Sequence, residues 1–460
     1  MKLPDYRHEP GRIAAHRSLF AEHVEVGAFL YEQRQTRLSA SAPEPAGWRS
    51  ARALEDRLET HVDALFLGRS TALEVCVEHG GEAAGPGELF VALSVFCRRQ
   101  EIDLVAATLR TLNHGDPARV LAAEHALSLE LPPAWIPFVA QALRTGRPGA
   151  VALMAGVCAH RRLPLADELL DAFANVPSDR MRIAEALARI GADAARAPLR
   201  AALRDLEPDL QETVLRALAR LGDADALQMA VEQSGGREWP LLAVALAGGR
   251  DDAERVLRGA SHAGASRDAL WAIGLGGLAD SSDVLCSALE QPAQAPFAAQ
   301  ALRWLTGADL HDDVFVPEAV DESLLFDDEL PAWRESGVAP ARADGSSYGE
   351  MQRQWSTDPR RWRAWLAEHW PAMDGQRRCR LGRPHGTEVL VDCLDDARSD
   401  PWIRAFAAEE LATRFGCPVA FETDLPVRVQ EARIAQMRAW TKGHPDTAAA
   451  GDWRSARARQ

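Results

Sequence analysis

Tryptophan and arginine are interleaved in one short part of the sequence, residues 355–384 (WSTDPRRWRAWLAEHWPAMDGQRRCRLGRP). This stretch holds four tryptophans and seven arginines against three acids, for a local charge of +4. Aromatic rings and guanidiniums in this pattern can stack on bases and bind phosphates, lie at a membrane surface, or form the centre of a protein–protein contact. The residue types alone leave these three uses open.

Charge elsewhere in the chain argues against the first two uses. The whole chain has a formal charge of −15 and a pI near 5.4, and residues 308–350 hold twelve acids and two arginines. A field of that sign repels nucleic acid and anionic lipid. We therefore expect no nucleic acid and no membrane as partner. The stretch is better interpreted as a packed helix with a role in partner binding or intramolecular docking.

Helical spacing assigns roles within the stretch. Asp358 followed by proline is a helix start, and Trp362 and Trp365 then share one face of a helix that runs to about residue 370. We predict that both tryptophans are largely buried. In the arginine-rich turn that follows, acidic groups of this chain or of a partner are predicted to meet Arg378, Arg380 and Arg383. Part of the arginine charge is expected to be neutralised by residues 309–329.

Patterns for catalysis and metal binding are missing from the sequence. It contains no phosphate-binding loop, dinucleotide-binding fingerprint, nucleophile elbow or H-E-x-x-H motif. Histidine–acid neighbours follow no shared repeat phase. His61, which has Asp63 close by, lies on a helical stripe with Leu58 and Leu65 and is interpreted as a residue at the edge of the core. We predict no catalytic, metal-binding or cofactor-binding residues, and expect no cofactor and no small-molecule substrate.

Composition indicates a helical chain in a reducing compartment. Hydrophobic residues make up 47% of the chain but aromatic residues only 6%, a balance that favours helix over strand. The seven cysteines form no C-x-x-C pair, and most stand among apolar neighbours as small buried side chains. No apolar signal segment opens the sequence, and its longest apolar run, Ala150–Ala159, is too short to cross a membrane. A cytoplasmic location is expected.

The elements that must position these residues follow a repeat of about 30 residues. Ala-Leu dipeptides, with Ala-Ile once in their place, recur at steps of 26 to 34 residues. They begin at Ala92, Ala126, Ala152, Ala186, Ala217, Ala245, Ala272 and Ala301. Such a period, built of two short helices, is typical of an α-solenoid, in which each hairpin buries its apolar face against the next.

Two copies show the repeat best, RIAEALARIGADAARAPLRAALRD (182–205) and LQETVLRALARLGDADALQMAVEQ (210–233). In each copy the first helix is predicted to end at a glycine, Gly191 or Gly222. An aspartate follows, Asp193 or Asp223, and is predicted to cap the second helix. These copies resemble the short HEAT repeats of the phycobilisome-lyase type.

The predicted fold is all-α, an α-solenoid of short HEAT-like helical hairpins with a small helical C-terminal module. Apolar periodicity stops after Gly307, and a second Asp-Pro helix start at Asp400 opens a last hairpin that closes at Gly416. Five parts follow in chain order: an N-terminal helical segment (1–49), the solenoid (50–307), an acidic linker (308–350), the C-terminal module (351–440) and a disordered tail (441–460).

Most of the chain is similar to a proteobacterial family of HEAT-repeat proteins without an assigned biochemical activity. The similarity is carried by EHVEVGAFLYEQR (22–34), LEDRLETHVDAL (54–65), the repeats, and RRWRAWLAEH with RCRLGRP (360–369, 378–384). Tyr31 and Cys379 stand where the family more often has tryptophan and tyrosine. Genes of this family often lie beside those of type VI secretion components, including PAAR-like tip proteins. The resemblance therefore implies a role near the loading or control of secreted effectors.

These observations favour a non-enzymatic scaffold that binds another protein through its long concave surface. The first hypothesis is an adaptor or chaperone for a type VI effector or a PAAR-like tip protein. An immunity protein that neutralises a cognate toxin is the second. The repeat resemblance alone suggests a third, a lyase-like enzyme acting on a bound prosthetic group.

Overall fold

The computed structural model describes residues 10–39, 47–203, 207–223, 225–226, 228–229, 241–260, 265–317, 325–326, 329–337, 340–341, 345–370, 375–444 and 451–453. Helices dominate these residues, so the predicted all-α fold class is confirmed. None of the described helices is both long enough and apolar enough to cross a membrane. All seven cysteines are buried thiols, as their apolar neighbours predicted.

Paired helices make up most of the chain and begin after a long N-terminal helix, α1 (Pro10–Ser39), and a 3-10 turn, η2 (Gly47–Ser50). They are α2 (Ala51–Leu67), α3 (Arg69–His79), α4 (Pro86–Arg98), α5 (Ile102–Thr111), α6 (Pro117–Glu130), α7 (Ile136–Arg144), α8 (Ala150–Arg161), α9 (Ala166–Asn175), α10 (Arg180–Ile190), α11 (Arg196–Ala202), α12 (Pro208–Arg220), α14 (Leu241–Ala247), α15 (Arg250–Ala260), α16 (Arg267–Gly276), α17 (Ser281–Ala288) and α18 (Ala295–Thr306).

One layer of the solenoid consists of α4, α6, α8, α10, α12, α14, α16 and α18, each of which contacts the next. Every Ala-Leu or Ala-Ile dipeptide of the repeat lies on one of these helices, and apart from Ala152 all of their residues are buried. Alanine allows neighbouring helices to approach closely, while the larger side chain beside it fills the space between them. The predicted repeat is therefore confirmed. We call these eight helices the inner layer.

Glycines end two helices of the inner layer as predicted. Gly191 and Gly222 follow α10 and α12 with φ of +73° and +78°, a left-handed conformation that is strained for residues with a Cβ atom. Asp223 accepts a hydrogen bond from the backbone N–H of Ala226 (3.0 Å). The capping role predicted for Asp193 is wrong, because this residue opens a 3-10 turn and its side chain makes no cap hydrogen bond to α11.

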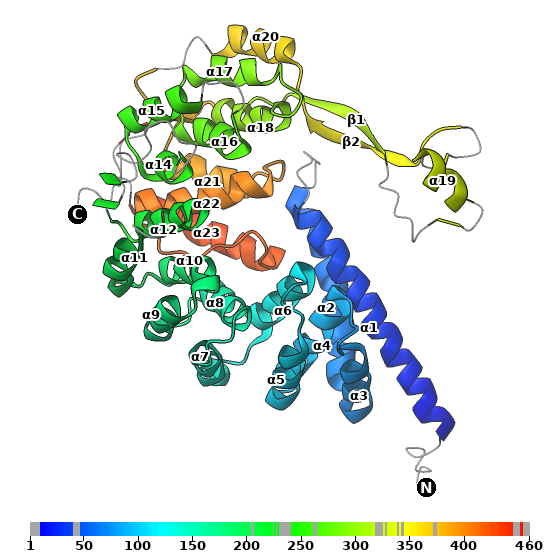
Figure 1. The fold of residues 1–460 in the computed structure, drawn as a ribbon. Helices are drawn as coiled ribbons and strands as arrows, with labels where there is room; N and C mark the ends of the chain where they lie inside the picture. The colour runs from blue at the N-terminus through cyan, green and yellow to red at the C-terminus, as the bar shows by residue number, and fades with distance from the viewer. Residues whose placement is uncertain are drawn as a thin grey trace.

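The C-terminal module consists of α20 (Pro359–His369), the paired short strands β3 (Cys379–Arg380) and β4 (Arg383–Pro384), α21 (Thr387–Asp395), α22 (Pro401–Phe415) and α23 (Val427–Gly443). Helices α21, α22 and α23 lie inside the arc of the solenoid, whereas α20 lies at its outer edge beside α17 (Figure 1). Helix α22 contacts α12 and α14 of the inner layer, and α23 contacts α2. Part of the concave side, which we expected to bind a partner, is thus occupied by the chain itself.

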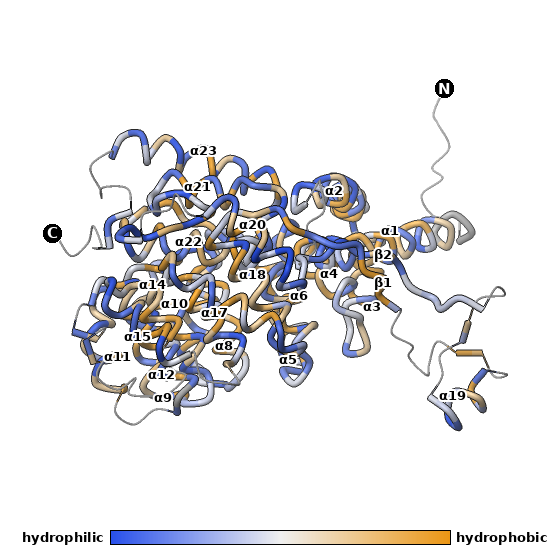
Figure 2. The backbone as a smooth tube through the Cα atoms, turned by 90° about the horizontal axis from the view of Figure 1, so that it is seen from above, coloured by the Kyte–Doolittle hydropathy of each residue, from blue (hydrophilic) through white to orange (hydrophobic). Residues whose placement is uncertain are grey.

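A β-hairpin arm interrupts the segment predicted to be an acidic linker. Strand β1 (His311–Pro317) pairs in antiparallel fashion with β2 (Gly349–Trp355), and a short helix, α19 (Leu330–Ser336), lies farther out. The arm extends away from the helical body (Figure 2). A two-stranded ribbon is only marginally stable alone. Its base is held by the buried Trp355, whose Nε1 donates to Asp400 (3.0 Å). The expectation of a linker without regular structure is wrong for the strands and for α19.

The predicted disordered tail contains ordered residues. Helix α23 continues to Gly443, and the backbone N–H of Gly451 donates to the carbonyl of His385 (2.7 Å). The carbonyl of Gly451 in turn accepts from the N–H of Arg378 (3.0 Å). Disorder is therefore a wrong prediction for residues 451–453, whereas 445–450 and 454–460 lie outside the described residues.

Candidate functional site

The two tryptophans singled out in the sequence lie on α20, which starts and ends as predicted. The Asp358 side chain accepts from the N–H of Arg360 and caps the helix. Trp362 is completely buried, and its Nε1 donates to the carbonyl of Ser356 (2.6 Å). Trp365 is half-buried, not largely buried as expected, and stacks on His369. The tryptophans therefore fix α20 to its own chain.

The three predicted arginines lie in and beside the turn between β3 and β4. Arg378 and Arg380 are fully buried, and each donates to Oε1 of Glu410 at 2.9 Å. Arg383 is exposed and donates to Asp392 at 2.7 Å. The structure thus brings Arg378 and Arg380 together and leaves Arg383 and the tryptophans apart from them. Their acidic partners come from α21 and α22. Residues 309–329 neutralise another arginine of the stretch, because Arg361 donates to Asp312, so the expectation for part of the arginine charge is confirmed.

Glu410 is the centre of a charged cluster that is closed to solvent. Besides the two guanidiniums, its carboxylate contacts Nε2 of His385 (3.1 Å). Burial raises the pKa of Glu410, but Arg380, His385 and Arg378 together lower it more, so its pKa lies below the usual range. Burial lowers the pKa of His385 to about 3. At neutral pH the cluster therefore holds an ionised carboxylate, a neutral imidazole and charged guanidiniums.

Backbone carbonyls at helix ends also compensate the charges of Arg378 and Arg380, and that of Arg414 on α22. Arg378 donates to the carbonyls of Ala245 and Leu275, Arg380 to those of Gly274 and Leu275, and Arg414 to those of Leu246 and Gly248. These carbonyls lie in or just after the last turns of α14 and α16, where helical oxygens lack intrahelical partners and the helix dipole is negative. The cluster therefore joins the C-terminal module to the ends of two inner-layer helices.

A second cluster forms where the loop before α23 meets the inner layer. Oδ2 of Asp424 accepts from Nε2 of His125 (3.0 Å), and Oδ1 lies 3.4 Å from Nε2 of His160. The other ring nitrogen of His125 accepts from the hydroxyl of the buried Tyr31 (3.0 Å). Burial raises the pKa of Asp424, but hydrogen bonds from both histidines lower it well below its usual range. The ionised side chain of Asp424 thus holds this loop against α6 and α8, which carry the two histidines.

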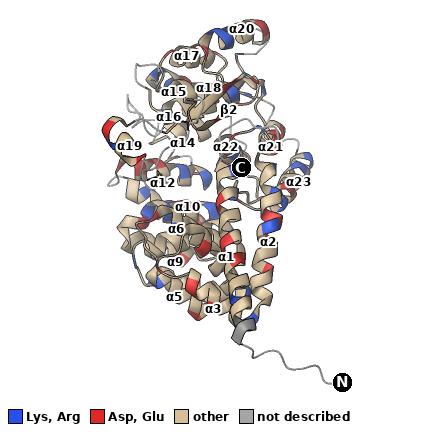
Figure 3. Cartoon of the chain, turned by 90° about the vertical axis from the view of Figure 1, so that its right-hand side faces the viewer, with Lys and Arg blue, Asp and Glu red and all other residues tan. Residues whose placement is uncertain are grey.

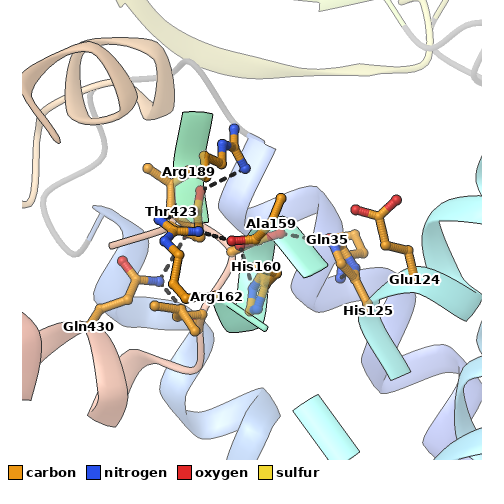
Figure 4. A network of polar contacts seen from close by, with 12 residues as sticks. Gln35, Glu124, His125, Ala159, His160, Arg162, Arg189, Thr423 and Gln430 are labelled. Atoms are coloured by element: carbon orange, nitrogen blue, oxygen red, sulfur yellow. Dashed lines mark hydrogen bonds and ion pairs between the residues drawn. The ribbon is translucent and has the colours of Figure 1, made fainter. Parts of the chain in front are cut away.

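Three arginines of the solenoid extend this second cluster. Arg162 directly follows α8, and Arg189 and Arg220 lie on α10 and α12. Glu422 lies 2.8 Å from Nη2 of Arg162 and 3.2 Å from Nη1 of Arg189. The next arginine, Arg220, pairs with Glu409 of α22. Figure 4 shows His160, Arg162 and Arg189 lying around the loop of Thr423, and Figure 3 marks basic residues on α10 and α12. Acidic side chains of the C-terminal module therefore pair with basic side chains after α8 and on α10 and α12 of the solenoid.

This docking site was not predicted from the sequence, although half of it left a signal there. Arg189 and Arg220 hold the same repeat position, two residues after the leucine of their Ala-Leu dipeptides. A basic residue repeated at one position predicts a basic stripe along one face of a solenoid. The matching acids, Glu409 and Glu422, follow no period. Their docking role could be recognised only from the tertiary structure, which shows the arginines that they contact.

Asp400, at the start of α22, gives a pH-dependent contribution to stability that can be measured. It is 2% exposed, and burial raises its pKa to about 7. Because the folded pKa lies above the unfolded value, the folded state binds more protons, and stability is lost as the pH rises through 7. Asp400→Asn removes this titration while retaining an oxygen for Trp355. Because the unfolded carboxyl is already ionised at pH 5, we expect the variant to be more stable by about 1 to 2 kcal/mol at that pH and by about 2 to 3 kcal/mol more at pH 8.5.

Thermal unfolding at the two pH values measures this difference. Asp251→Asn is the matched control, because Asp251 is exposed in the first turn of α15 and should show no such pH-dependent gain. A loss of stability for Asp400→Asn at both pH values would contradict the buried-carboxyl explanation.

Comparison with known proteins agrees with the repeat architecture. A family model described as HEAT repeats matches residues 164–248, a span that includes α9, α10, α11, α12 and α14. A search of curated proteins finds no match to this chain. The matched span contains both sequence copies in which the repeat is most regular, 182–205 and 210–233. The chain is therefore an all-α, solenoid-like protein that contains HEAT repeats.

Proposed function

We propose that this chain is a protein-binding scaffold and that the arm of β1, β2 and α19 is its partner surface. HEAT repeats commonly present extended surfaces to other proteins. Over α12 and α14, however, the surface facing the inside of the arc is covered by α22. A different surface is therefore proposed for the partner, and the arm extends away from the helical body (Figure 2).

Exposed apolar side chains on the arm are the observation that carries this proposal. Phe315 and Met351 lie opposite one another across the two strands and are 42% and 62% exposed. Beyond the strands, Tyr348 and Phe326 are 45% and 74% exposed. A group of exposed apolar side chains on one element is typical of a protein-interaction site. The acidic composition of residues 308–350 complements a partner with an apolar centre and a basic rim.

The proposed partner is a type VI secretion effector or PAAR-like tip protein, for which the chain is a non-enzymatic adaptor or chaperone. The similarity of residues 22–34, 54–65, 360–369 and 378–384 to a family whose genes often lie beside type VI components supports this choice. A chaperone has to release its client, and an arm that makes few contacts with its own body offers a surface that can be occupied and vacated.

Removal of the apolar pair tests the arm. The variant Phe315→Ser/Met351→Ser should no longer retain the products of neighbouring secretion genes on co-purification, and its Kd for such a partner should rise at least about thirtyfold. Both side chains are exposed, so the unfolding midpoint should stay close to that of the unmodified protein.

Leu121→Ser is the control for this experiment, because Leu121 is a similarly exposed apolar residue on α6, away from the arm. Equal retention by both variants would show that the arm is not the contact surface. If no neighbouring product is retained by the unmodified chain at micromolar concentration, the adaptor role is wrong. Growth rescue on co-expression with an adjacent toxin gene would indicate an immunity protein instead.

A further inference from the structure

A cleft of about 670 Å³ lies where the N-terminal half of the solenoid meets the start of α23. Its apolar walls come from both sides of this junction and include Leu58, Val62, Phe90, Leu425, Pro426 and Val429. The volume lies in the range of small-ligand sites, which commonly combine apolar walls with a few polar groups. Nothing in the proposed role of the arm requires this cleft, so its chemistry is a separate question.

The acidic residues that line the cleft are already neutralised. Glu55 pairs with Arg34 (2.8 Å) and accepts from the backbone N–H of residue 427. Glu59 and Glu130 both pair with Arg98, at 2.7 and 2.6 Å. These three acids therefore offer little attraction to a cationic ligand, because each faces a guanidinium of its own chain.

Two basic residues in the cleft lack such compensation within the described part of the chain. Arg161, the last residue of α8, makes no hydrogen bond or ion pair there, although it is half-buried. Arg433 of α23 donates only to the neutral side chain of Gln436 (3.1 Å). Burial lowers the pKa of Arg161, although the nearby Cys97 and Glu130 partly offset this effect. An anion in the cleft would supply the missing partner.

A buried hydroxyl adds an independent sign of a ligand. Ser128 on α6 is 5% exposed and lines the cleft, and its Oγ has no hydrogen-bond partner among the described residues. A helical serine usually satisfies its hydroxyl on the carbonyl four residues earlier, as Ser94 does on Phe90 in the same cleft. An unsatisfied buried hydroxyl costs stability unless something binds to it.

We propose that this cleft binds a carboxylate joined to an apolar body, with the carboxylate on Arg161 and Ser128 and the body against the apolar walls. Arg433 is half-buried and adds long-range attraction. The same chemistry is found in a free medium-chain acid and in the C-terminus of an apolar peptide. The site is independent of the arm and accepts a ligand whether or not a partner is bound there.

Isothermal titration calorimetry of the full chain tests the proposal with three probes: octanoate, an acetylated Leu-Val-Leu peptide with a free carboxylate, and the same peptide as its amide. We expect at least one acid to bind, and the amide to bind at least tenfold more weakly than the free peptide if the peptide does. Binding of octanoate alone would identify a free acid as the ligand class, and binding of the peptide alone would identify a chain terminus.

Two variants locate the carboxylate. Arg161→Gln should weaken acid binding about ten- to hundredfold, because hydrogen bonds to a charged group are lost, and Ser128→Ala about three- to tenfold. Arg110→Gln, on the exposed side of α5, should leave binding unchanged. Thermal unfolding verifies that each variant is folded. If Arg161→Gln does not fold, Ser128→Ala still tests the site. Equal binding of acid and amide, no binding of either acid at millimolar concentration, or unchanged affinity in the folded variants would overturn the proposal.

Discussion

Replacement of Glu410 by Gln is expected to lower the free energy of unfolding by about 3 to 5 kcal/mol. Glu410 is the carboxylate that Arg378 and Arg380 share inside the molecule, where no water can replace it. Glutamine has nearly the same shape but no charge, and its amide nitrogen would face groups that are themselves donors. The variant therefore leaves two buried guanidiniums without a counter-charge, a change that costs much more than loss of an exposed ion pair.

Chemical denaturation at neutral pH measures the expected loss. The control is Glu388→Gln on the neighbouring α21, where the glutamate is exposed in the first turn and contributes less than about 1 kcal/mol through the helix dipole. If both variants lose the same small amount, the helix-end carbonyls alone suffice to hold the arginines. Hydrogen exchange should place the larger loss for Glu410→Gln in α14, α16 and α22, which meet at the cluster.

The repeat could be predicted from sequence because local signals and tertiary packing agree in it. An alanine followed by a larger aliphatic residue marks each inner-layer helix. The glycine after α10 ends that helix through its own backbone conformation, whatever the helix packs against. The start of α20 at Asp358 and that of α22 at Asp400 were likewise visible, since proline in a first helical turn acts through its own backbone. These features depend on residues only a few positions apart.

The C-terminal docking could not be predicted, because the contacts of Arg378 and Asp424 with the solenoid join residues that lie 103 to 299 positions apart. Arg378 binds carbonyls near Ala245 and Leu275, and Asp424 binds His125 from 299 positions away. A backbone carbonyl leaves no trace in the sequence, since every residue carries one. The helix-end carbonyl partners of Arg378 and Arg380 therefore could not be predicted, although acidic partners could. The aromatic, arginine-rich stretch was compatible with partner binding or intramolecular docking, and the chain uses much of it to hold itself together.

The arm was missed for a related reason. Strands β1 and β2 are separated by thirty-one residues, and acidic side chains mask the short apolar run of β1. Hairpins are recognisable in sequence when a tight turn joins their strands, and no such turn is present between these two. The exposure of Phe315 and Met351 supports a partner-binding role for the arm, which the composition of the segment alone did not suggest.

A charge swap tests whether the second cluster holds the module in the arc. Glu422→Arg should lower the free energy of unfolding by about 2 to 4 kcal/mol, because it places a third guanidinium beside Arg162 and Arg189, which now share its carboxylate. Adding Arg189→Glu to this variant should restore at least about 1 kcal/mol, since the pair is reversed and not removed. The restoration should be partial, because the new carboxylate also lies near Glu409, which raises the pKa of Arg189 in the unmodified chain.

Glu254→Arg is the matched control for the swap, because Glu254 pairs with Arg250 on the exposed face of α15 and its loss should cost less than about 1 kcal/mol. Faster hydrogen exchange in α23 than in α10 is expected for Glu422→Arg alone, because the loop that carries residue 422 leads directly into α23. If Glu422→Arg costs no more than Glu254→Arg, the loop rests on the inner layer without holding the module there. In that case the Glu410 cluster and the remaining contacts, such as Asp424 with His125 and Glu409 with Arg220, hold the module without a contribution from Glu422.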